Sequence, residues 1–300
     1  MGENTLNINW FPGHMAKTRR QITEDIKLVD VVIELLDARI PISSQNPEIK
    51  QIIKNKKKII VLNKSDLADE KLNNEWVKEF ARNGEISVLT DSNTGKGINE
   101  VFKQIKNIMT EELEKASNKG RIGKKIRVMI VGIPNVGKSS FINRIAKRNT
   151  AEVGNKPGVT KQKQWIRLDN DIELLDTPGV LWPKFESEEV ALHLAFTGTI
   201  KEDILQRTEI AYYIVKFLIE HYPKKLCERY KITEEYIKQQ LSNTERAENE
   251  NIYEIFLEIG RKRGCIISGG NIDEEKTARI LLDEFKNGKL GKITIEDELD

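Results

Sequence analysis

The segment Gly-Ile-Pro-Asn-Val-Gly-Lys-Ser at residues 132–139 constrains the fold of this chain more than any other feature. An apolar run at 128–131 precedes it, and residues 140–147 follow with a helical spacing of apolar side chains. Glycines in such a turn let several backbone N–H groups point inward, and the start of a helix favours negative charge at the same place. The sequence therefore predicts a strand, a phosphate-binding loop and a helix, in that order.

The loop also predicts which residues hold the phosphates of a nucleotide. We expect Lys138 to reach the β and γ phosphates, and we expect the Ser139 hydroxyl to bind Mg²⁺. Further contacts are expected from Asn135, Val136, Gly137 and Ser140. The flanking strand and helix are the context that this motif requires, so a chance glycine turn is a poor alternative.

Short apolar runs elsewhere indicate a parallel sheet. They cover residues 29–36, 59–62, 86–90 and 127–131, and helical patterns separate them. Near-continuous hydrophobicity of this kind is typical of strands that crossover helices bury on both faces. Residues 163–168 and 171–175, with Asp-Asn between them, instead predict an antiparallel hairpin. The expected fold class is α/β, with a mostly parallel sheet and helices on both faces.

Asn-Lys-Ser-Asp at residues 63–66 follows the second apolar run and identifies the base. A carboxylate at the carboxyl end of a parallel strand lies at the ligand crevice of such a sheet. Asp66 can accept hydrogen bonds from N1–H and the 2-amino group of guanine, whereas adenine presents an acceptor at N1. We expect Asn63 to contact the other base edge and the Lys64 stem to pack on the ring. Ser92 is a candidate second base contact, although a plain loop serine explains it equally well.

Two segments after the phosphate loop predict the switches of a GTPase. Asp176 and Gly179 belong to Asp-Thr-Pro-Gly, which follows the second strand of the hairpin; Asp176 would hold Mg²⁺ and the Gly179 N–H would sense the γ phosphate. Thr160 lies between the phosphate-loop helix and the hairpin, where it can close over the metal. We therefore expect Lys138, Thr160 and Gly179 to take part in hydrolysis.

The residue after Gly179 is Val180, where many GTPases carry a glutamine that orients water. An aliphatic side chain cannot do this, so intrinsic hydrolysis should be slow until another group acts. His14, between a Pro-Gly pair and a basic segment, is one candidate, although a lone histidine is more often solvated or capping. His193 and His221 lie in predicted helices and are interpreted as structural.

The order of these motifs indicates a circular permutation. Residues 63–66 precede residues 132–139, whereas most GTPases have the reverse order. A basic connector at 115–127 would join the usual termini, so that both halves form one sheet. We expect a permuted P-loop GTPase domain at 1–185 and a mainly helical domain at 186–300, consistent with a chain of 300 residues.

Composition limits the remaining possibilities. The formal net charge is only +2, so a nucleic-acid partner must be inferred from local basic clusters, here 17–20, 115–127 and 261–263. Each cluster can also be a plain solvated face. No apolar run approaches the roughly 20 residues of a bilayer span, so we expect no membrane span and a cytoplasmic protein. Cys227 and Cys265 are isolated and predict free thiols.

The motif order, with two flanking sequences, resembles the ribosome biogenesis GTPase A family of circularly permuted bacterial GTPases. These sequences are Asn-Trp-Phe-Pro-Gly-His-Met-Ala-Lys at 9–17 and Leu-Trp-Pro-Lys-Phe at 181–185. Further likeness is found at 222–223, 261–265 and 268–270, so the resemblance covers almost the whole chain. No nucleotide motif departs from the family pattern.

The resemblance implies a GTP-hydrolysing switch that acts in late assembly of the large ribosomal subunit. It places the hydrolytic histidine at His14, matches Val180 to the family's aliphatic substitution, and matches Asn135 to an asparagine that helps bind K⁺ near the phosphates in related GTPases. It also implies that the helical domain contacts rRNA. We expect GTP and GDP as ligands, Mg²⁺ as cofactor with K⁺ as a second candidate ion, and a monomer that ribosomal particles stimulate.

Two other function classes remain open at this point. A small-molecule kinase or ATPase would need no guanine reader, so residues 63–66 argue against it. A nucleotide-gated RNA-binding module with little hydrolysis would explain Val180 equally well. Phosphate release with and without ribosomal particles distinguishes this module from a GTPase.

Overall fold

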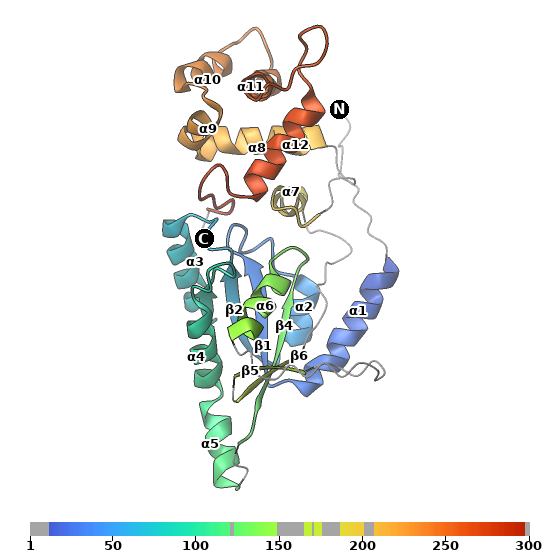
Figure 1. Cartoon of the computed structure of the whole chain (residues 1–300), viewed down its shortest axis with the longest axis vertical. Coiled ribbons are helices and arrows are strands. Elements are labelled where there is room, and N and C mark those ends of the chain that lie inside the picture. The colour runs from blue at the N-terminus through green and yellow to red at the C-terminus, as the bar shows by residue number, and fades with distance from the viewer. Residues whose placement is uncertain are drawn as a thin grey trace. The chain divides into compact units, whose positions relative to one another are not determined.

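The computed structural model describes residues 12–120, 123–148, 165–169, 171–175, 187–200 and 207–297, with the backbone alone at 12–18, 147–148 and 169. The chain divides into two compact units, each described here by itself (Figure 1). One unit holds the described residues up to 175 together with 294–297, and the other holds the described residues from 187 to 293. We call them the GTPase-fold unit and the helical unit.

The first unit is built on a six-stranded sheet with the order β3-β2-β1-β4-β6-β5 (Figure 1). Its strands are β1 (Val31–Asp37), β2 (Lys57–Asn63), β3 (Ser87–Leu89), β4 (Ile126–Gly132), β5 (Trp165–Asp169) and β6 (Ile172–Leu175). β1 pairs in parallel with both β2 and β4, so the strands from the two halves of the sequence form one sheet. The predicted permuted α/β fold is confirmed.

Helices cover this sheet because its strands are apolar on both faces. The helices of this unit are α1 (Pro12–Asp25), a 3₁₀ turn (Ile26–Leu28), α2 (Pro47–Ile53), α3 (Glu70–Arg82), α4 (Ile98–Ile108), α5 (Thr110–Asn118) and α6 (Lys138–Arg148). Of these, α5 follows α4 and has no buried residue. Val32 and Leu36 are four residues apart on β1 and therefore point to the same face. Val32 packs with residues of α1 and α2, and Leu36 packs with Trp76 and Phe80 of α3.

The opposite face of the sheet is equally covered. Ile33 and Leu35 of β1 are fully buried, and α4 and α6 contact β2 and β4. Complete burial of such a side chain contributes about 1.5–3 kcal/mol, so covering both faces supplies most of the driving force for this unit.

The structure contains the predicted hairpin, but the predicted connector is only partly a linker. β5 pairs antiparallel with β6, as the sequence predicts. The basic connector expected at 115–127 is only partly a linker, because its first residues continue α5 and its last two begin β4. Its cations also have acidic neighbours: Lys124 pairs with Asp30, and Lys125 with Glu173.

The helical unit consists of short helices joined by capped turns. They are α7 (Glu188–Phe196), α8 (Arg207–His221), α9 (Pro223–Tyr230), α10 (Glu234–Leu241), α11 (Glu248–Lys262) and α12 (Glu274–Lys286). Ser187 and Asp273 accept hydrogen bonds from Val190 N and Lys276 N and so cap α7 and α12. α8 packs against α7, α9, α11 and α12 and lies at the centre of the unit.

A buried carboxylate ties three parts of the helical unit together. Glu284 of α12 accepts hydrogen bonds from Arg229 at 2.6 and 3.0 Å and from Arg263 at 2.9 Å. Burial by itself would raise the pKa of Glu284, but the arginine hydrogen bonds and charges outweigh it and lower that pKa. Arg263, which belongs to the predicted basic cluster 261–263, is therefore a structural residue.

The C-terminal segment departs from the expected domain boundary. Residues 294–297 were expected in the helical domain, but they lie in the GTPase-fold unit. Thr294 is fully buried there, and Ile295 is 4% exposed.

No helix in the described part of the chain is both long and apolar enough to cross a membrane.

Candidate functional site

Sheet register brings the predicted phosphate loop and base reader together. Asp37 at the end of β1 lies beside Asn63 at the end of β2, and Leu35 lies beside Gly132 at the end of β4. Because these strands are parallel, the loops that follow them meet at the same edge of the sheet. This edge is where α/β folds of this type bind ligands.

The phosphate loop adopts the tight conformation that its glycines allow. It runs from the end of β4 to Lys138, the first residue of α6, and Asn135 and Gly137 have φ values of 59° and 97°. A Cβ on Gly137 would lie 2.4 Å from Asn63 Nδ2, and one on Gly132 would lie 2.6 Å from the Leu35 carbonyl. The loop backbone therefore approaches its neighbours more closely than any side chain permits.

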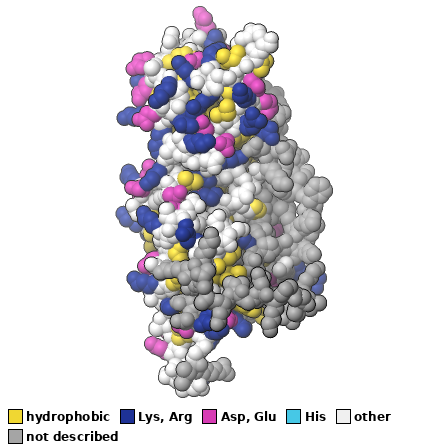
Figure 2. Space-filling view, in the orientation of Figure 1, with side chains coloured by type: hydrophobic (Ala, Val, Ile, Leu, Met, Phe, Trp, Pro, Cys, Tyr) yellow, Lys and Arg dark blue, Asp and Glu magenta, His cyan; other side chains and the backbone are white. Residues whose placement is uncertain are grey.

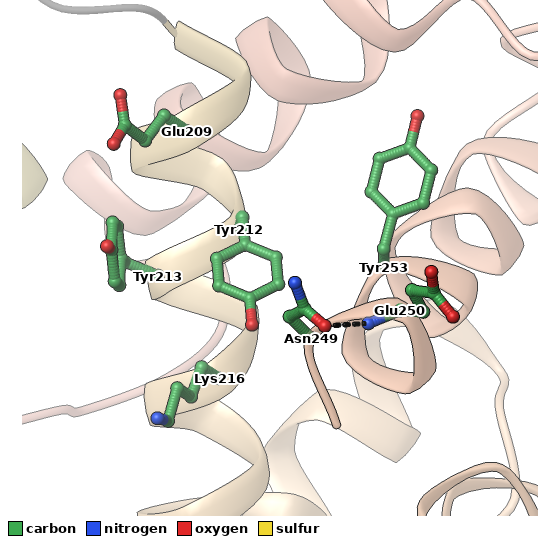
Figure 3. Close-up of a pocket in the computed structure, with 7 residues that line it drawn as sticks. All are labelled: Glu209, Tyr212, Tyr213, Lys216, Asn249, Glu250 and Tyr253. Carbon is green, nitrogen blue, oxygen red and sulfur yellow. Dashed lines mark hydrogen bonds between the residues drawn. The ribbon is translucent and has the colours of Figure 1, made fainter. Parts of the chain in front are cut away.

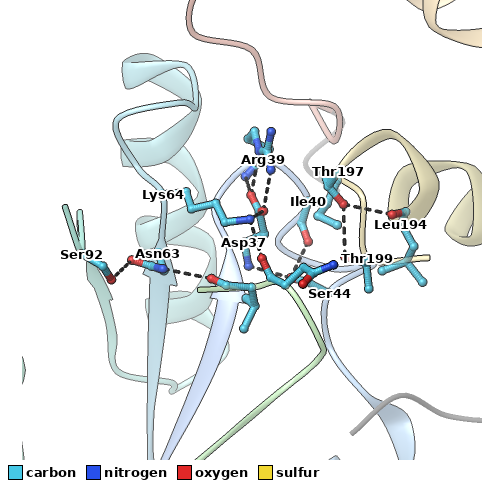
Figure 4. A network of polar contacts seen from close by, with 12 residues as sticks. Asp37, Arg39, Ile40, Ser44, Asn63, Lys64, Ser92, Leu194, Thr197 and Thr199 are labelled. Carbon is cyan, nitrogen blue, oxygen red and sulfur yellow. Dashed lines mark hydrogen bonds and ion pairs between the residues drawn. The ribbon is translucent and has the colours of Figure 1, made fainter. Parts of the chain in front are cut away.

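Asn63 joins the two halves of the site (Figure 4). Its Nδ2 donates to the Val136 carbonyl at 2.9 Å, and its Oδ1 accepts from the hydroxyls of Ser92 at 2.7 Å and Thr90 at 3.2 Å. Asn63 is 1% exposed, so these contacts fix its orientation. Ser92, which the sequence predicts as a base contact, holds Asn63 through this hydrogen bond, and its carbonyl accepts from Arg144 Nε of α6 at 2.9 Å.

Lys64 makes a second bridge between the halves. Its φ of 58° is unusual for a residue with a side chain, and its ammonium donates to Asp37 Oδ2 at 2.9 Å and to the Asn135 carbonyl at 2.7 Å. The conformation turns the chain directly after β2 and directs the side chain across to the phosphate loop. The segment at 63–66 and the phosphate loop are thus held together by side-chain contacts from both Asn63 and Lys64.

Sequence reasoning missed Asp37 and Arg39, which support Lys64 (Figure 4). Both are 2% exposed, and the Arg39 guanidinium donates to the two Asp37 carboxylate oxygens at 2.9 and 2.8 Å. Burial would raise the pKa of Asp37, but the charges of Arg39 and Lys64 lower it well below its usual range. The available signal was Asp-Ala-Arg directly after a buried strand next to the base-reading strand.

Asp66 carries a buried hydrogen-bond acceptor that lacks a donor among the described residues. Its Oδ1 is buried and has no hydrogen-bond partner among the described residues. Burial, followed by the negative charge of Asp91, raises its pKa above the ordinary 3.8. A buried, unsatisfied carboxylate oxygen is costly, and a ligand that donates hydrogen bonds to it would remove that cost.

The remaining predicted residues are only partly described. Val136 is buried, whereas Ser139 and Ser140 are exposed in the first turn of α6. Thr160, Asp176, Gly179 and Val180 lie outside the described residues, and for His14 the structure describes only the backbone, within α1. The ring of His221 stacks on Phe217 at 4.8 Å within the helical unit.

An open pocket of about 540 Å³ belongs to the helical unit and is separate from these motifs (Figure 3). Tyr212 and Lys216 of α8 face Asn249, Glu250 and Tyr253 of α11 across it. Tyrosines and glutamates outnumber its single lysine, so the pocket is poorly suited to phosphate. We do not assign it to nucleotide binding.

Comparisons with known proteins agree with this geometry. Residues 127–255 match a family model described as 50S ribosome-binding GTPase. Together with the phosphate loop and the parallel sheet, this match defines a P-loop GTPase. Ribosome biogenesis GTPase A of Bacillus cereus is 47% identical over 96% of this chain and 93% of its own length. The Thermotoga maritima protein of the same name is 31% identical over 96% and 94%.

The chain therefore belongs to the ribosome biogenesis GTPase A family and is a GTPase with GTP as its substrate. Two solved structures of YlqF from T. maritima share the fold. The GNP-bound structure has a TM-score of 0.60 and the GDP-bound structure one of 0.62. Each is 28% identical and covers 94% of this chain and 100% of the YlqF chain.

The close approach at Gly137 gives a direct test of the site. Gly137→Ala is expected to weaken binding of a fluorescent GDP analogue by at least about tenfold, because the new Cβ displaces Asn63 and the backbone conformation is unfavourable for alanine. Gly84→Ala is the control, since Gly84 has a φ of 72° with nothing described within 4 Å of an added Cβ. Equal affinities for the two variants would show that the contact is unimportant.

Proposed function

We propose that this GTPase is a switch in assembly of the large ribosomal subunit, slow alone and stimulated by the ribosomal particle. Membership of the family supports a role in ribosome biogenesis. The observation that carries the residue assignments is the unpartnered Oδ1 of Asp66, on a loop that Asn63 and Lys64 tie to the phosphate loop. One half of the sequence thereby reads the base, and the other holds the phosphates.

Guanine fits the Asp66 carboxylate because N1–H and the 2-amino group both donate. Each charge-assisted hydrogen bond contributes about 1.5–3 kcal/mol, so the pair accounts for most of the discrimination against adenine. Lys64 packs its stem against the ring while its ammonium stays on Asp37 and the Asn135 carbonyl. Ser92 supports this reading indirectly, through its hydrogen bond to Asn63.

We assign the phosphates to this loop because its backbone turns tightly at Gly137, where an added Cβ would lie 2.4 Å from Asn63 Nδ2. Asn135, Val136, Gly137 and Ser140 line the phosphates in this proposal, and Lys138 neutralises the β and γ positions. Ser139, Thr160 and Asp176 would hold Mg²⁺, which supplies positive charge to the transferring phosphoryl group. The Gly179 N–H would contact the γ phosphate.

Hydrolysis is slow in this proposal because Val180 cannot orient water, as a glutamine would. An unassisted GTPase of this kind turns over at about 10⁻⁴–10⁻³ s⁻¹. We assign His14, at the start of α1, as the group that the particle brings to the nucleotide. Thr160 closes over the metal in the GTP state and releases after hydrolysis.

Arginines of two predicted basic clusters lie close to acidic side chains of the same unit. Contact with rRNA would therefore involve Lys and Arg side chains spread over the surface. Arg19 lies 3.9 Å from Glu48, Arg20 lies 3.2 Å from Glu24, and Arg261 lies 3.1 Å from Glu258. On the face drawn in Figure 2, Lys and Arg side chains lie among Asp and Glu side chains. We propose contact with rRNA phosphates through the helical unit, by a cytoplasmic monomer that docks on the particle in its GTP state.

The base assignment predicts a change of specificity. Asp66→Asn should weaken GTP binding at least about tenfold and favour xanthosine nucleotides, because an amide donates where guanine also donates. A second prediction concerns pH. Burial raises the pKa of Asp66, and its protonated form loses an acceptor. As the pH is lowered, the GTP affinity of the parent protein should therefore begin to fall at a higher pH than it would for an aspartate with the ordinary pKa. Fluorescent-nucleotide titrations between neutral and acidic pH measure both, and unchanged GTP affinity in Asp66→Asn rejects the assignment.

The role of the particle predicts a stimulated rate that depends on His14. Large-subunit particles should raise phosphate release by the parent protein, and His14→Ala should remove most of this stimulation while GDP affinity is kept. His221→Ala is a matched control, because that ring stacks on Phe217 in the helical unit. Co-sedimentation with GDP and with a nonhydrolysable GTP analogue checks docking. Nucleotide-dependent docking without stimulation would instead support an RNA-binding module with little hydrolysis.

Potassium is a second proposed ion, with Asn135 as its contact. Asn135 is exposed at the phosphate loop, and its carbonyl accepts from Lys64. A cation there would supply charge that an arginine supplies in other GTPases. Turnover should therefore be higher in potassium chloride than in sodium chloride at equal ionic strength, and equal rates would remove K⁺ from the proposal.

A further inference from the structure

The C-terminal residues 294–296, which we call the C-terminal strap, are fastened to the GTPase-fold unit by five hydrogen bonds. The Thr294 hydroxyl accepts from Asp69 N at 3.0 Å, and Ile295 N donates to the Arg39 carbonyl at 2.8 Å. The Glu296 carboxylate accepts from the backbone N–H groups of residues 42 and 43 at 2.6 and 2.8 Å. The Glu296 carbonyl accepts from Trp76 Nε1 at 2.9 Å.

These contacts fasten the two segments that frame the proposed base reader. Arg39 and residues 42–43 follow β1, while Asp69 and Trp76 follow the loop at 63–66. Both segments begin at the carboxyl end of a strand beside the nucleotide motifs. The strap therefore crosses from one segment to the other and limits how far they can separate.

A continuous chain of polar contacts leads from the strap to Lys64. The strap holds the backbone of Arg39, whose guanidinium grips both oxygens of Asp37. Asp37 in turn accepts from the Lys64 ammonium at 2.9 Å. The planar Arg39–Asp37 pair is almost fully buried and tolerates little displacement, so a shift of the Arg39 backbone must move Asp37 or break the pair.

The strap is also joined to the helical unit by a very short length of chain. The Lys292 carbonyl accepts from the Lys225 ammonium within the helical unit, and Thr294 is already fixed in the GTPase-fold unit. Only Ile293 separates the two anchor points. Two Cα–Cα steps span at most about 7–8 Å, so the stretch of chain between these two anchors is short.

We propose that Asp37, Arg39 and the C-terminal strap are positioning residues for Lys64 and the guanine-reading loop, and that release of the strap changes nucleotide selectivity through them. This inference rests on the base-reading role proposed above for residues 63–66. When the strap leaves, the Arg39 segment relaxes, Lys64 loses a fixed acceptor and Asp66 is held less firmly. By thermodynamic linkage, guanine nucleotide must tighten the strap by the same factor as the strap tightens the nucleotide.

The test compares GDP with IDP, which lacks the 2-amino donor, in full-length variants. Glu296→Gln, which removes the charge on residues 42–43, should lower the preference for GDP over IDP by about fivefold, a typical size for such coupling. Arg39→Lys, which keeps the charge but loses the two-pronged contact, should lower it similarly. Glu245→Gln, at an exposed position of the helical unit, is the control and should keep the preference.

Hydrogen exchange distinguishes a positioning role from a purely structural one, because a purely structural contact would exchange at the same rate with and without GDP. In the parent protein, GDP should slow exchange of the Ile295 amide, which donates to the Arg39 carbonyl. Asp66→Asn is the reference: if it keeps the GDP preference, the base reader itself is wrong. If Asp66→Asn loses the preference while Glu296→Gln and Arg39→Lys keep it, and Ile295 exchange ignores GDP, the positioning role is overturned.

Discussion

Two side chains hold the nucleotide site together across more than seventy residues of sequence. Asn63 donates to the Val136 carbonyl and Lys64 to the Asn135 carbonyl, so the loop at 63–66 and the phosphate loop are held together. A neutral buried hydrogen bond contributes about 1 kcal/mol and a charged one about 1.5–3 kcal/mol, which is enough to fix two loops. The parallel register of β1, β2 and β4 makes both contacts possible, because it ends these strands at one edge.

The support behind those contacts explains why several charged residues are buried. Arg39 and Asp37 are sequestered as a pair, and Lys64 completes the neutralisation of Asp37. Removing one member of this group would leave an uncompensated buried charge and would cost several kcal/mol. Electrostatics elsewhere follows the same pattern, since Arg229 and Arg263 share Glu284 in the helical unit. These arginines therefore serve ion pairs within the fold.

Most of the fold could be predicted from the sequence because its signals are local. Near-continuous apolar runs fixed the strands, and the spacing of glycine, lysine and serine fixed the phosphate loop. Asp37, Arg39 and the strap could not be predicted, because their roles depend on long-range pairing: Glu296 finds its donors more than 250 residues away. An acidic C-terminal tail normally indicates a solvated end. The contact of Ser92 with Asn63 could not be predicted for the same reason, although its loop was.

The central position of β1 has a consequence for the newborn protein. Its neighbour β2 follows closely in the sequence, but β4 begins roughly ninety residues later, which at about 5–20 residues per second means a delay on the order of 5 to 20 s during translation. Throughout that interval one edge of β1 has no partner strand, and open edges invite pairing with other chains. In the permuted order, the half that carries residues 63–66 is therefore synthesised first, and its sheet is completed only when β4 follows.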